Sequence, residues 1–182
     1  MNNNKIKRLV FVALTGALVL LLAKTTKFPP FLQAPYLKLE FGEIPLLLLL
    51  MLASSGMALE ALVLKELLSF FLFGSNFLAL IADFVACGTF LVVFSLVWRK
   101  GGGIRRILLA TIIGTAARML ISIPDNLIIL PLQYGTPIVG VWTQMIYILP
   151  FNALKSILDG ACILIVYPRI KKPLERYFIG LT

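Results

Sequence analysis

The sequence contains no histidine and very few side chains that could carry chemistry. Without histidine, the common zinc sites and the Ser-His-Asp triad are excluded. Cys87 and Cys162 lie in separate apolar runs without CxxC spacing, so we interpret them as packing residues and not as a metal site or redox pair. An HExxH motif, a nucleophile elbow and a phosphate-binding loop are also missing. We therefore expect no catalytic residues, no metal site, no cofactor and no enzymatic activity.

Charge is scarce as well, since only 14% of the residues are charged while 60% are hydrophobic and the mean hydropathy is +0.98. A soluble domain of this length could not cover its surface with so few polar groups. In lipid, helices satisfy every backbone polar group within one segment. The composition predicts an all-α integral membrane protein, a compact bundle of six transmembrane helices that forms a single domain over residues 1–182.

Apolar runs and helix breakers give the approximate positions of these helices. We expect helices at residues 6–23, 44–53, 57–73 and 76–98, a fifth from 104 that weakens at Pro124, and a sixth that ends near Tyr167. The start of the chain resembles a secretory signal but lacks a cleavage site, so we interpret it as a retained helix. Residues 24–43 are predicted to form a long first outer loop. Residues 124–150, interrupted by Pro and Gly, are predicted to form a second, partly helical outer loop.

The net charge of +9 could suggest nucleic-acid binding, but the positions of the basic residues indicate membrane topology instead. Eleven of the 17 basic residues fall at three places that an even number of spans puts on one side: Lys5, Lys7, Arg8; Arg99, Lys100, Arg105, Arg106; Arg169, Lys171, Lys172, Arg176. The other side receives Lys24, Lys27 and Lys38. By the positive-inside rule, both termini are predicted to be cytoplasmic.

Charged residues inside the apolar runs are costly in lipid and are candidates for function. They are Glu60, Lys65, Glu66, Asp83, Arg118, Lys155 and Asp159. Asn152 precedes Lys155 by three residues, so both side chains lie on one helix face, and an amide beside an ammonium suits the polar edge of a flat ligand. The alternative is that these charges pair between helices, with Lys155 held by a carboxylate such as Asp159.

Two further segments are candidate interaction sites. Ala13, Gly16 and Ala17 form a strip of small residues along the first helix, which would let another helix approach closely, either within the bundle or from a partner. The segment 28–45 is rich in aromatic residues and proline, and residues 36–41 alternate as an extended strand does. This segment could cover a pocket, or it could lie at the lipid headgroups as an aromatic belt.

Two stretches carry a resemblance to a known family. The segment 35–45 (PYLKLEFGEIP), which follows a helix containing Ala13 and Ala17, and the segment 149–155 (LPFNALK) resemble the riboflavin-binding substrate (S) components of energy-coupling factor (ECF) transporters, as does Asn126. The resemblance covers the whole chain in length and helix order. Glu66 departs from it, since a neutral residue would be expected there.

The resemblance implies that residues 1–182 form a single substrate-binding domain in a prokaryotic cell membrane. This high-affinity subunit would take up riboflavin, with FMN as a further candidate ligand, and would dock onto a transmembrane coupling protein that carries two ATPases. The flavin contacts would fall on Leu37, Leu39, Glu40, Phe41, Asn126, Asn152 and Lys155. The docking surface would be formed by Ala13 and Ala17. No nucleic acid is expected as a partner.

Three alternatives stay open at this stage. An S component for another vitamin would share the fold. A small ion-coupled transporter would use an intramembrane acid such as Asp83 or Asp159. A membrane scaffold protein would bind no small ligand at all.

Overall fold

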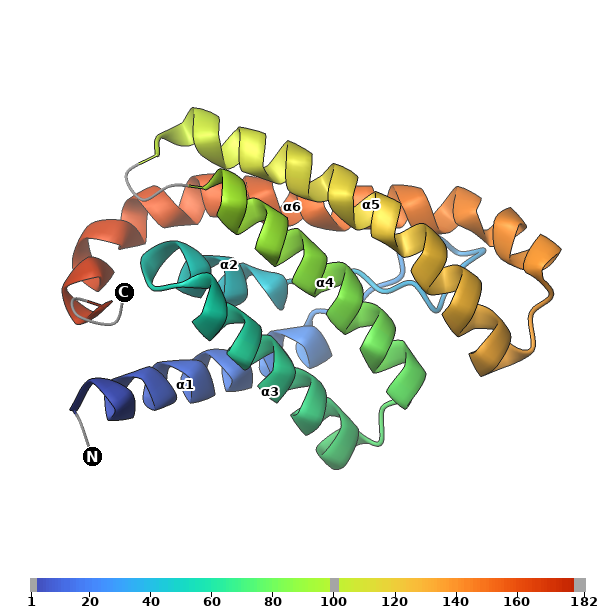
Figure 1. Ribbon diagram of the computed structural model, residues 1–182, viewed down its shortest axis with the longest axis horizontal. Helices are drawn as coiled ribbons and strands as arrows, with labels where there is room; N and C mark the ends of the chain where they lie inside the picture. The colour runs from blue at the N-terminus through green and yellow to red at the C-terminus, as the bar shows by residue number, and fades with distance from the viewer. Residues whose placement is uncertain (1–2, 99–101, 179–182) are drawn as a thin grey trace.

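The computed structural model describes residues 3–98 and 102–178, and Figure 1 shows that its regular structure is helical. The helices within these ranges are α1 (Asn3–Thr25), α2 (Glu43–Leu52), α3 (Ser55–Phe73), α4 (Phe77–Val97), α5 (Ile104–Tyr134) and α6 (Ile138–Phe178). Four segments are long and apolar enough to cross a membrane: 4–25, 77–97, 104–134 and 138–173. The predicted all-α fold is confirmed. The extended pattern at residues 36–41 yields a single bridge, between Phe28 and Leu39.

The prediction of a second outer loop at residues 124–150 is wrong. Helix α5 continues through Pro124 and Pro131, and α6 continues through Pro150 and on to Phe178, well past the predicted end. A proline removes one backbone hydrogen bond and bends a helix, but neighbouring helices in a membrane bundle tolerate this. The actual break is short, because Gly135 ends α5 in the left-handed region (φ 65°) and α6 begins at Ile138.

Helix α2 lies inside the bundle and differs from the other helices in length. Its 10 residues rise about 15 Å, half of what a membrane core requires. Leu46 and Leu47 are fully buried, and the Ser54 side chain caps the start of α3 by accepting a hydrogen bond from Met57 N at 3.3 Å. The short helix is therefore buried along most of its length, and this packing fixes the position of Glu43 at its first turn.

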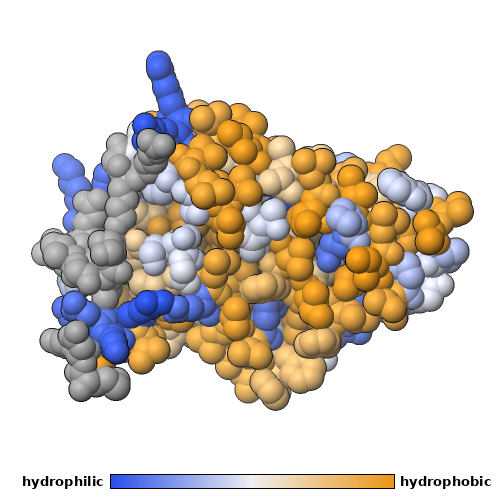
Figure 2. Space-filling view, viewed as in Figure 1, coloured by the Kyte–Doolittle hydropathy of each residue, from blue (hydrophilic) through white to orange (hydrophobic). Residues whose placement is uncertain are grey.

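The basic ends of the helices gather at one end of the molecule. In Figure 1 the start of α1, the start of α5 and the end of α6 lie on the left, together with both termini. Figure 2 shows hydrophilic side chains concentrated at this end and a broad hydrophobic surface over the middle. Of the basic residues used for the topology prediction, Arg99 and Lys100 lie outside the described residues, and the Arg176 side chain is also not described. The cytoplasmic placement of this end remains a prediction.

Candidate ligand-binding site

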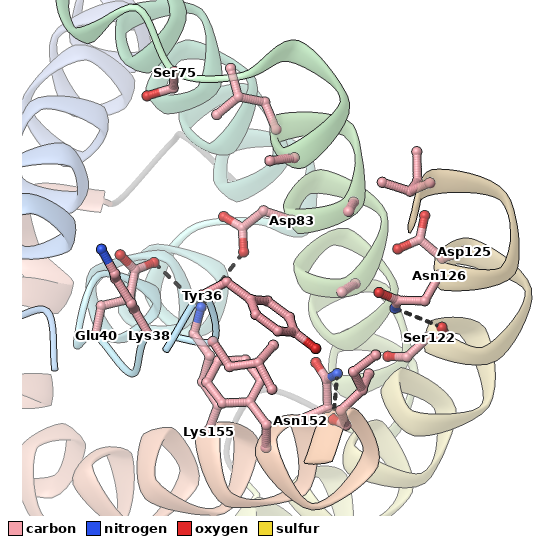
Figure 3. A pocket seen from close by; sticks show the side chains of 18 of the residues that line it. Tyr36, Lys38, Glu40, Ser75, Asp83, Ser122, Asp125, Asn126, Asn152 and Lys155 are labelled. Atoms are coloured by element: carbon pink, nitrogen blue, oxygen red, sulfur yellow. Dashed lines mark hydrogen bonds and ion pairs between the residues drawn. The ribbon is translucent and has the colours of Figure 1, made fainter. Parts of the chain in front are cut away.

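A cavity of about 310 Å³ opens at the end of the bundle away from the termini. Its walls come from the last turn of α1, the segment 26–42, the end of α3, the start of α4, the second half of α5 and the first half of α6. Its volume falls in the usual range for small-ligand pockets, about 300–1,000 Å³. Because five helices and a loop contribute to its walls, the cavity collects residues that are far apart in the sequence (Figure 3).

The lining combines an apolar wall with polar groups. The apolar side chains include Leu37, Leu80, Ile129, Leu130, Ile148 and Phe151. The polar ones include Tyr36, Lys38, Glu40, Asp83, Asp125, Asn126, Gln133, Asn152 and Lys155. This is the pattern expected for a flat, partly polar ligand, whose ring needs apolar contact and whose edge needs a few fixed hydrogen-bonding groups.

Five of the seven side chains that the resemblance implied as ligand contacts line this cavity: Leu37, Glu40, Asn126, Asn152 and Lys155. Leu39 and Phe41 do not line it. Leu39 is buried and its backbone pairs with Phe28 (N to O 2.9 Å), while Phe41 N donates to the Thr26 hydroxyl at 3.1 Å. The backbone hydrogen bonds of these two residues hold the loop in place.

Two asparagines occupy equivalent places on facing helices. Asn126 follows Pro124 by two residues on α5, and Asn152 follows Pro150 by two residues on α6. Each donates its side-chain Nδ2 to the carbonyl four residues earlier, at 2.8 Å and 3.0 Å. Each amide is thereby fixed in orientation. In Figure 3 the Asn126 oxygen points toward the cavity, whereas the Asn152 oxygen accepts a hydrogen bond from Arg118 Nε at 2.9 Å.

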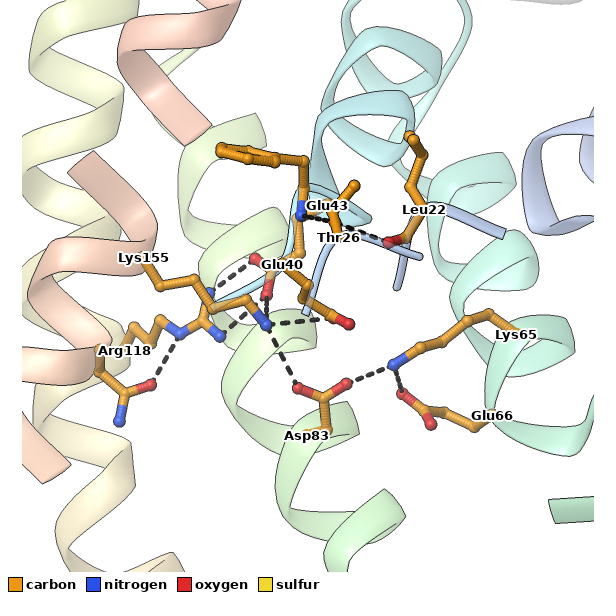
Figure 4. A network of polar contacts seen from close by, with 11 residues as sticks. Leu22, Thr26, Glu40, Glu43, Lys65, Glu66, Asp83, Arg118 and Lys155 are labelled. Carbon is orange, nitrogen blue, oxygen red and sulfur yellow. Dashed lines mark hydrogen bonds and ion pairs between the residues drawn. The ribbon is translucent and has the colours of Figure 1, made fainter. Parts of the chain in front are cut away.

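Seven side chains at the cavity wall and directly behind it form what we call the charged network, shown in Figure 4: Glu40, Glu43, Lys65, Glu66, Asp83, Arg118 and Lys155. Arg118 and Glu43 form a bidentate pair with N–O distances of 2.6 and 2.9 Å. Lys65 lies 2.7 Å from Glu66 and also contacts Asp83. The network joins five helices and the first loop, so the charges in the apolar runs are largely internal ion pairs.

Lys155 is the centre of this network. Its ammonium lies 2.7 Å from Glu43, 3.3 Å from Glu40 and 3.6 Å from Asp83. It does pair with carboxylates, as the alternative interpretation held, but they come from α2, α4 and the loop and not from Asp159. A ligand is therefore not needed to neutralise Lys155. Glu60, by contrast, is exposed and pairs with Arg8 on α1.

The first loop lies over the cavity and contacts the start of α6. The Tyr36 hydroxyl donates to Gln144 Oε1 at 2.7 Å, and the rings of Phe31 and Tyr147 lie 6.0 Å apart. Partial burial raises the pKa of Tyr36 above its ordinary value, so the phenol stays protonated and can donate this bond at neutral pH. Phe28 and Leu39 close the base of the loop. The loop is thus positioned as a cover over the cavity.

The strip of small residues on α1 has two sides. Gly16 is buried against α3, where an added Cβ would come within 2.9 Å of Leu64 and 3.3 Å of the Ala61 carbonyl. Ala13 and Ala17 are both exposed on the outer face of α1. The glycine therefore serves packing inside the bundle, and the two alanines remain available for a partner helix.

Comparison with known proteins identifies the family. The sequence model for the substrate-specific component of ECF transporters matches residues 7–168. The chain belongs to this family. Membership of this family, together with the four long apolar helices, identifies the chain as a multi-pass membrane protein that acts in transport and not in catalysis. The described residues hold no group of three or more His, Cys, Asp or Glu side chains suited to a metal ion.

Three curated relatives align with nearly the whole chain. The riboflavin transporter RibU of Staphylococcus aureus is 27% identical over 97% of this chain and 96% of its own length. RibU of Streptococcus thermophilus is 24% identical over 93% and 85%, and the riboflavin transporter FmnP of Bacillus subtilis is 26% identical over 94% and 96%. A solved S component of a bacterial ECF transporter superposes with a TM-score of 0.74 at 25% identity, covering 93% of this chain and 98% of that one.

Sequence reasoning missed several residues of the site. Glu43 was not singled out, although it binds both Arg118 and Lys155. Glu43 is the last residue of the predicted loop, next to the start of a helix. An acidic residue at a helix N-terminus is usually exposed to solvent, so nothing in the sequence indicates a buried ion pair. Tyr36, Asp125 and Gln133 also line the cavity. Their contribution depends on how the loop folds back and on α5 continuing past Pro124, which no local pattern revealed.

Proposed function

We propose that this chain is the riboflavin-binding S component of an ECF vitamin transporter. Three relatives that bear the name of riboflavin transporters align with at least 93% of the chain and with at least 85% of their own lengths. The observation that carries the proposal is the cavity at the end of the bundle away from the termini, with its Leu, Ile and Phe wall and fixed asparagines. A flat isoalloxazine ring with one polar edge is complementary to such a lining.

Within this proposal, the flavin contacts are Leu37, Glu40, Asn126, Asn152 and Lys155. Asn126 is best placed to meet the polar ring edge, since its oxygen is directed into the cavity. Lys155 would act together with its carboxylate neighbours on the ribityl chain. Leu39 and Phe41 would contribute by holding the loop over the ligand. Lys24, Lys27 and Lys38 at the cavity wall would also suit the phosphate of FMN.

The proposed setting is a prokaryotic cell membrane, with all six helices in the bundle, both termini cytoplasmic and residues 1–182 forming one transmembrane domain. The exposed Ala13 and Ala17 would contact the transmembrane coupling protein, which carries the two ATPases. Small residues on an exposed helix face permit this kind of close helix packing. Energy for uptake would then come from the partner subunits.

Titration calorimetry of the purified chain tests the proposal. We expect riboflavin to bind tightly with a stoichiometry of one, and biotin and thiamine not to compete. Binding heat from one of these vitamins, with none from riboflavin, would make the chain an S component for another vitamin. Uptake into liposomes that is driven by an ion gradient and needs no partner would instead support a secondary transporter.

A further inference from the structure

A second group of buried polar side chains lies between α5 and α6, one helical turn beyond Lys155. Thr115, Ser156 and Asp159 are 7%, 0% and 1% exposed. Within the described part of the chain, four of their oxygens are buried without a hydrogen-bond partner: Thr115 Oγ1, Ser156 Oγ, and Oδ1 and Oδ2 of Asp159. Unpaired buried polar atoms are rare in native proteins and costly, so this Thr-Ser-Asp group indicates an unassigned role.

The packing of α5 against α6 places the members of this group together. Arg118 Nε donates to Asn152 Oδ1 at 2.9 Å near the cavity. About two turns further, the Thr111 side chain fills the space that a side chain at Gly160 would take. Thr115 lies between Thr111 and Arg118 on α5, and Ser156 lies between Asn152 and Gly160 on α6. The register of the two helices therefore places Thr115 level with Ser156. The aspartate follows the serine by three residues, on the same buried face of α6.

The two hydroxyls of the group differ from others in these helices. Thr111, Ser122 and Thr143 each donate to the backbone carbonyl four residues earlier, at 2.9, 2.7 and 3.1 Å. This bond is the usual way in which a helical Ser or Thr satisfies its hydroxyl. Thr115 and Ser156 do not form it within the described structure. Their oxygens are therefore available to another group at the interface.

The charge balance of the interior gives an independent argument. The charged network holds four carboxylates and three cations, an excess of one negative charge. An ionised Asp159 would raise this excess to two. The charged groups that act on Asp159 are Glu43 from α2, Lys155 on α6, Arg118 on α5 and Glu40 from the loop. Both cations are already paired with other carboxylates, so a negative charge here would lack a partner in a low-dielectric interior.

We infer that Thr115, Ser156 and Asp159 form a proton-binding site beneath the ligand cavity. Asp159 takes up one proton from solvent and becomes a neutral carboxylic acid with a single O–H donor. None of these oxygens has a partner in the described structure, so a side-chain rotation brings this O–H to one of the two hydroxyls. No other bond forms or breaks. The neutral acid removes the second excess charge and holds the part of α6 that carries Asn152 and Lys155 against α5. This inference does not depend on the identity of the ligand.

Infrared spectroscopy of the purified chain tests the site directly. A protonated carboxylic acid has a carbonyl band separate from the amide and carboxylate bands, and we expect it at neutral pH. Labelling of aspartate with carbon-13 should shift the band, which distinguishes Asp159 from Glu66, whose Oε2 is also unpartnered. The variant Asp159→Asn should lack the band, and the matched variant Glu66→Gln should keep it.

Thermal unfolding adds a second readout. Asp159→Asn replaces the neutral acid with a neutral amide of the same shape, so we expect an unchanged Tm, and sodium or potassium should not change the Tm of the wild-type chain. If Asp159→Asn does not fold, the labelled band is measured in Asp83→Asn and Asp125→Asn, the other two aspartates of the chain, and it should persist in both. The inference is overturned if no aspartate-dependent band exists in the wild-type chain, or if sodium stabilises that chain and Asp159→Asn abolishes the effect.

Discussion

Arg118 on α5 donates two hydrogen bonds, from both terminal nitrogens of its guanidinium group, to the carboxylate of Glu43 at the first turn of α2, at N–O distances of 2.6 and 2.9 Å. Both residues are almost fully buried. The pair fixes the short inner helix, and Glu43 in turn lies 2.7 Å from Lys155, which lines the cavity. The geometry of the ligand site therefore depends on a buried ion pair beneath it.

Breaking this pair should be far more damaging than breaking an exposed one. Arg118→Ala leaves Glu43 buried beside fewer positive charges, and loss of one partner of a buried pair costs about 3–5 kcal/mol. The matched control is Arg8→Ala, since the Arg8–Glu60 pair is about half exposed and such pairs contribute roughly 0–1 kcal/mol. Unfolding followed by circular dichroism in detergent measures both. Equal losses would contradict the role of the network.

The topology prediction can be tested by labelling in whole cells. Gln33 is exposed in the first loop, which lines the cavity through Tyr36 and Leu37, and Gly102 lies at the opposite end of the molecule, next to the start of α5 (Figure 1). A cysteine at position 33 should react with a membrane-impermeant maleimide, and one at position 102 should react only after the cells are opened. The native Cys87 and Cys162 are replaced by alanine beforehand. Reversed labelling would place the cavity on the cytoplasmic side.

Larger side chains on the two sides of the α1 strip should have different effects, on partner binding at Ala13 and Ala17 and on stability at Gly16. Replacing Ala13 and Ala17 with leucine should abolish co-purification with the coupling protein while ligand affinity stays within about threefold, because both residues are exposed. Gly16→Leu is the contrasting variant, since it forces a side chain against Leu64 and should lower the Tm. If the variant with leucine at both positions does not fold, Ala13 and Ala17 pack within the bundle and do not form a docking surface.

Asn126→Ala and Asn152→Ala test the cavity residues. Loss of a hydrogen bond to a buried ligand group costs about 1–3 kcal/mol, which corresponds to a roughly five- to hundredfold weaker affinity. We expect the larger effect at Asn126, since the oxygen of Asn152 is already bonded to Arg118. Lys155→Ala should lower both affinity and stability, because three carboxylates lose their shared cation. Unchanged calorimetric affinity in both folded asparagine variants would rule out this assignment.

The sequence predicted the parts of this structure that depend on local pattern. Apolar runs located the helices, because an apolar segment in lipid has few alternatives to a helix. The course of the chain past Pro124 and Pro150 was not predictable, since packing against neighbouring helices decides whether a proline bends or ends a helix. The partners of Lys155 were not predictable either. They come from α2, α4 and the first loop, which meet only in the folded bundle.

The absorption spectrum of the chain purified from its host membrane tests the central proposal most directly. A flavin absorbs visible light, and no side chain of this protein does. We predict a yellow protein with a flavin spectrum in about one-to-one ratio, which persists through dialysis and is lost on unfolding. A colourless folded protein that takes up no flavin when riboflavin is added, and whose Tm does not rise with it, would contradict the account.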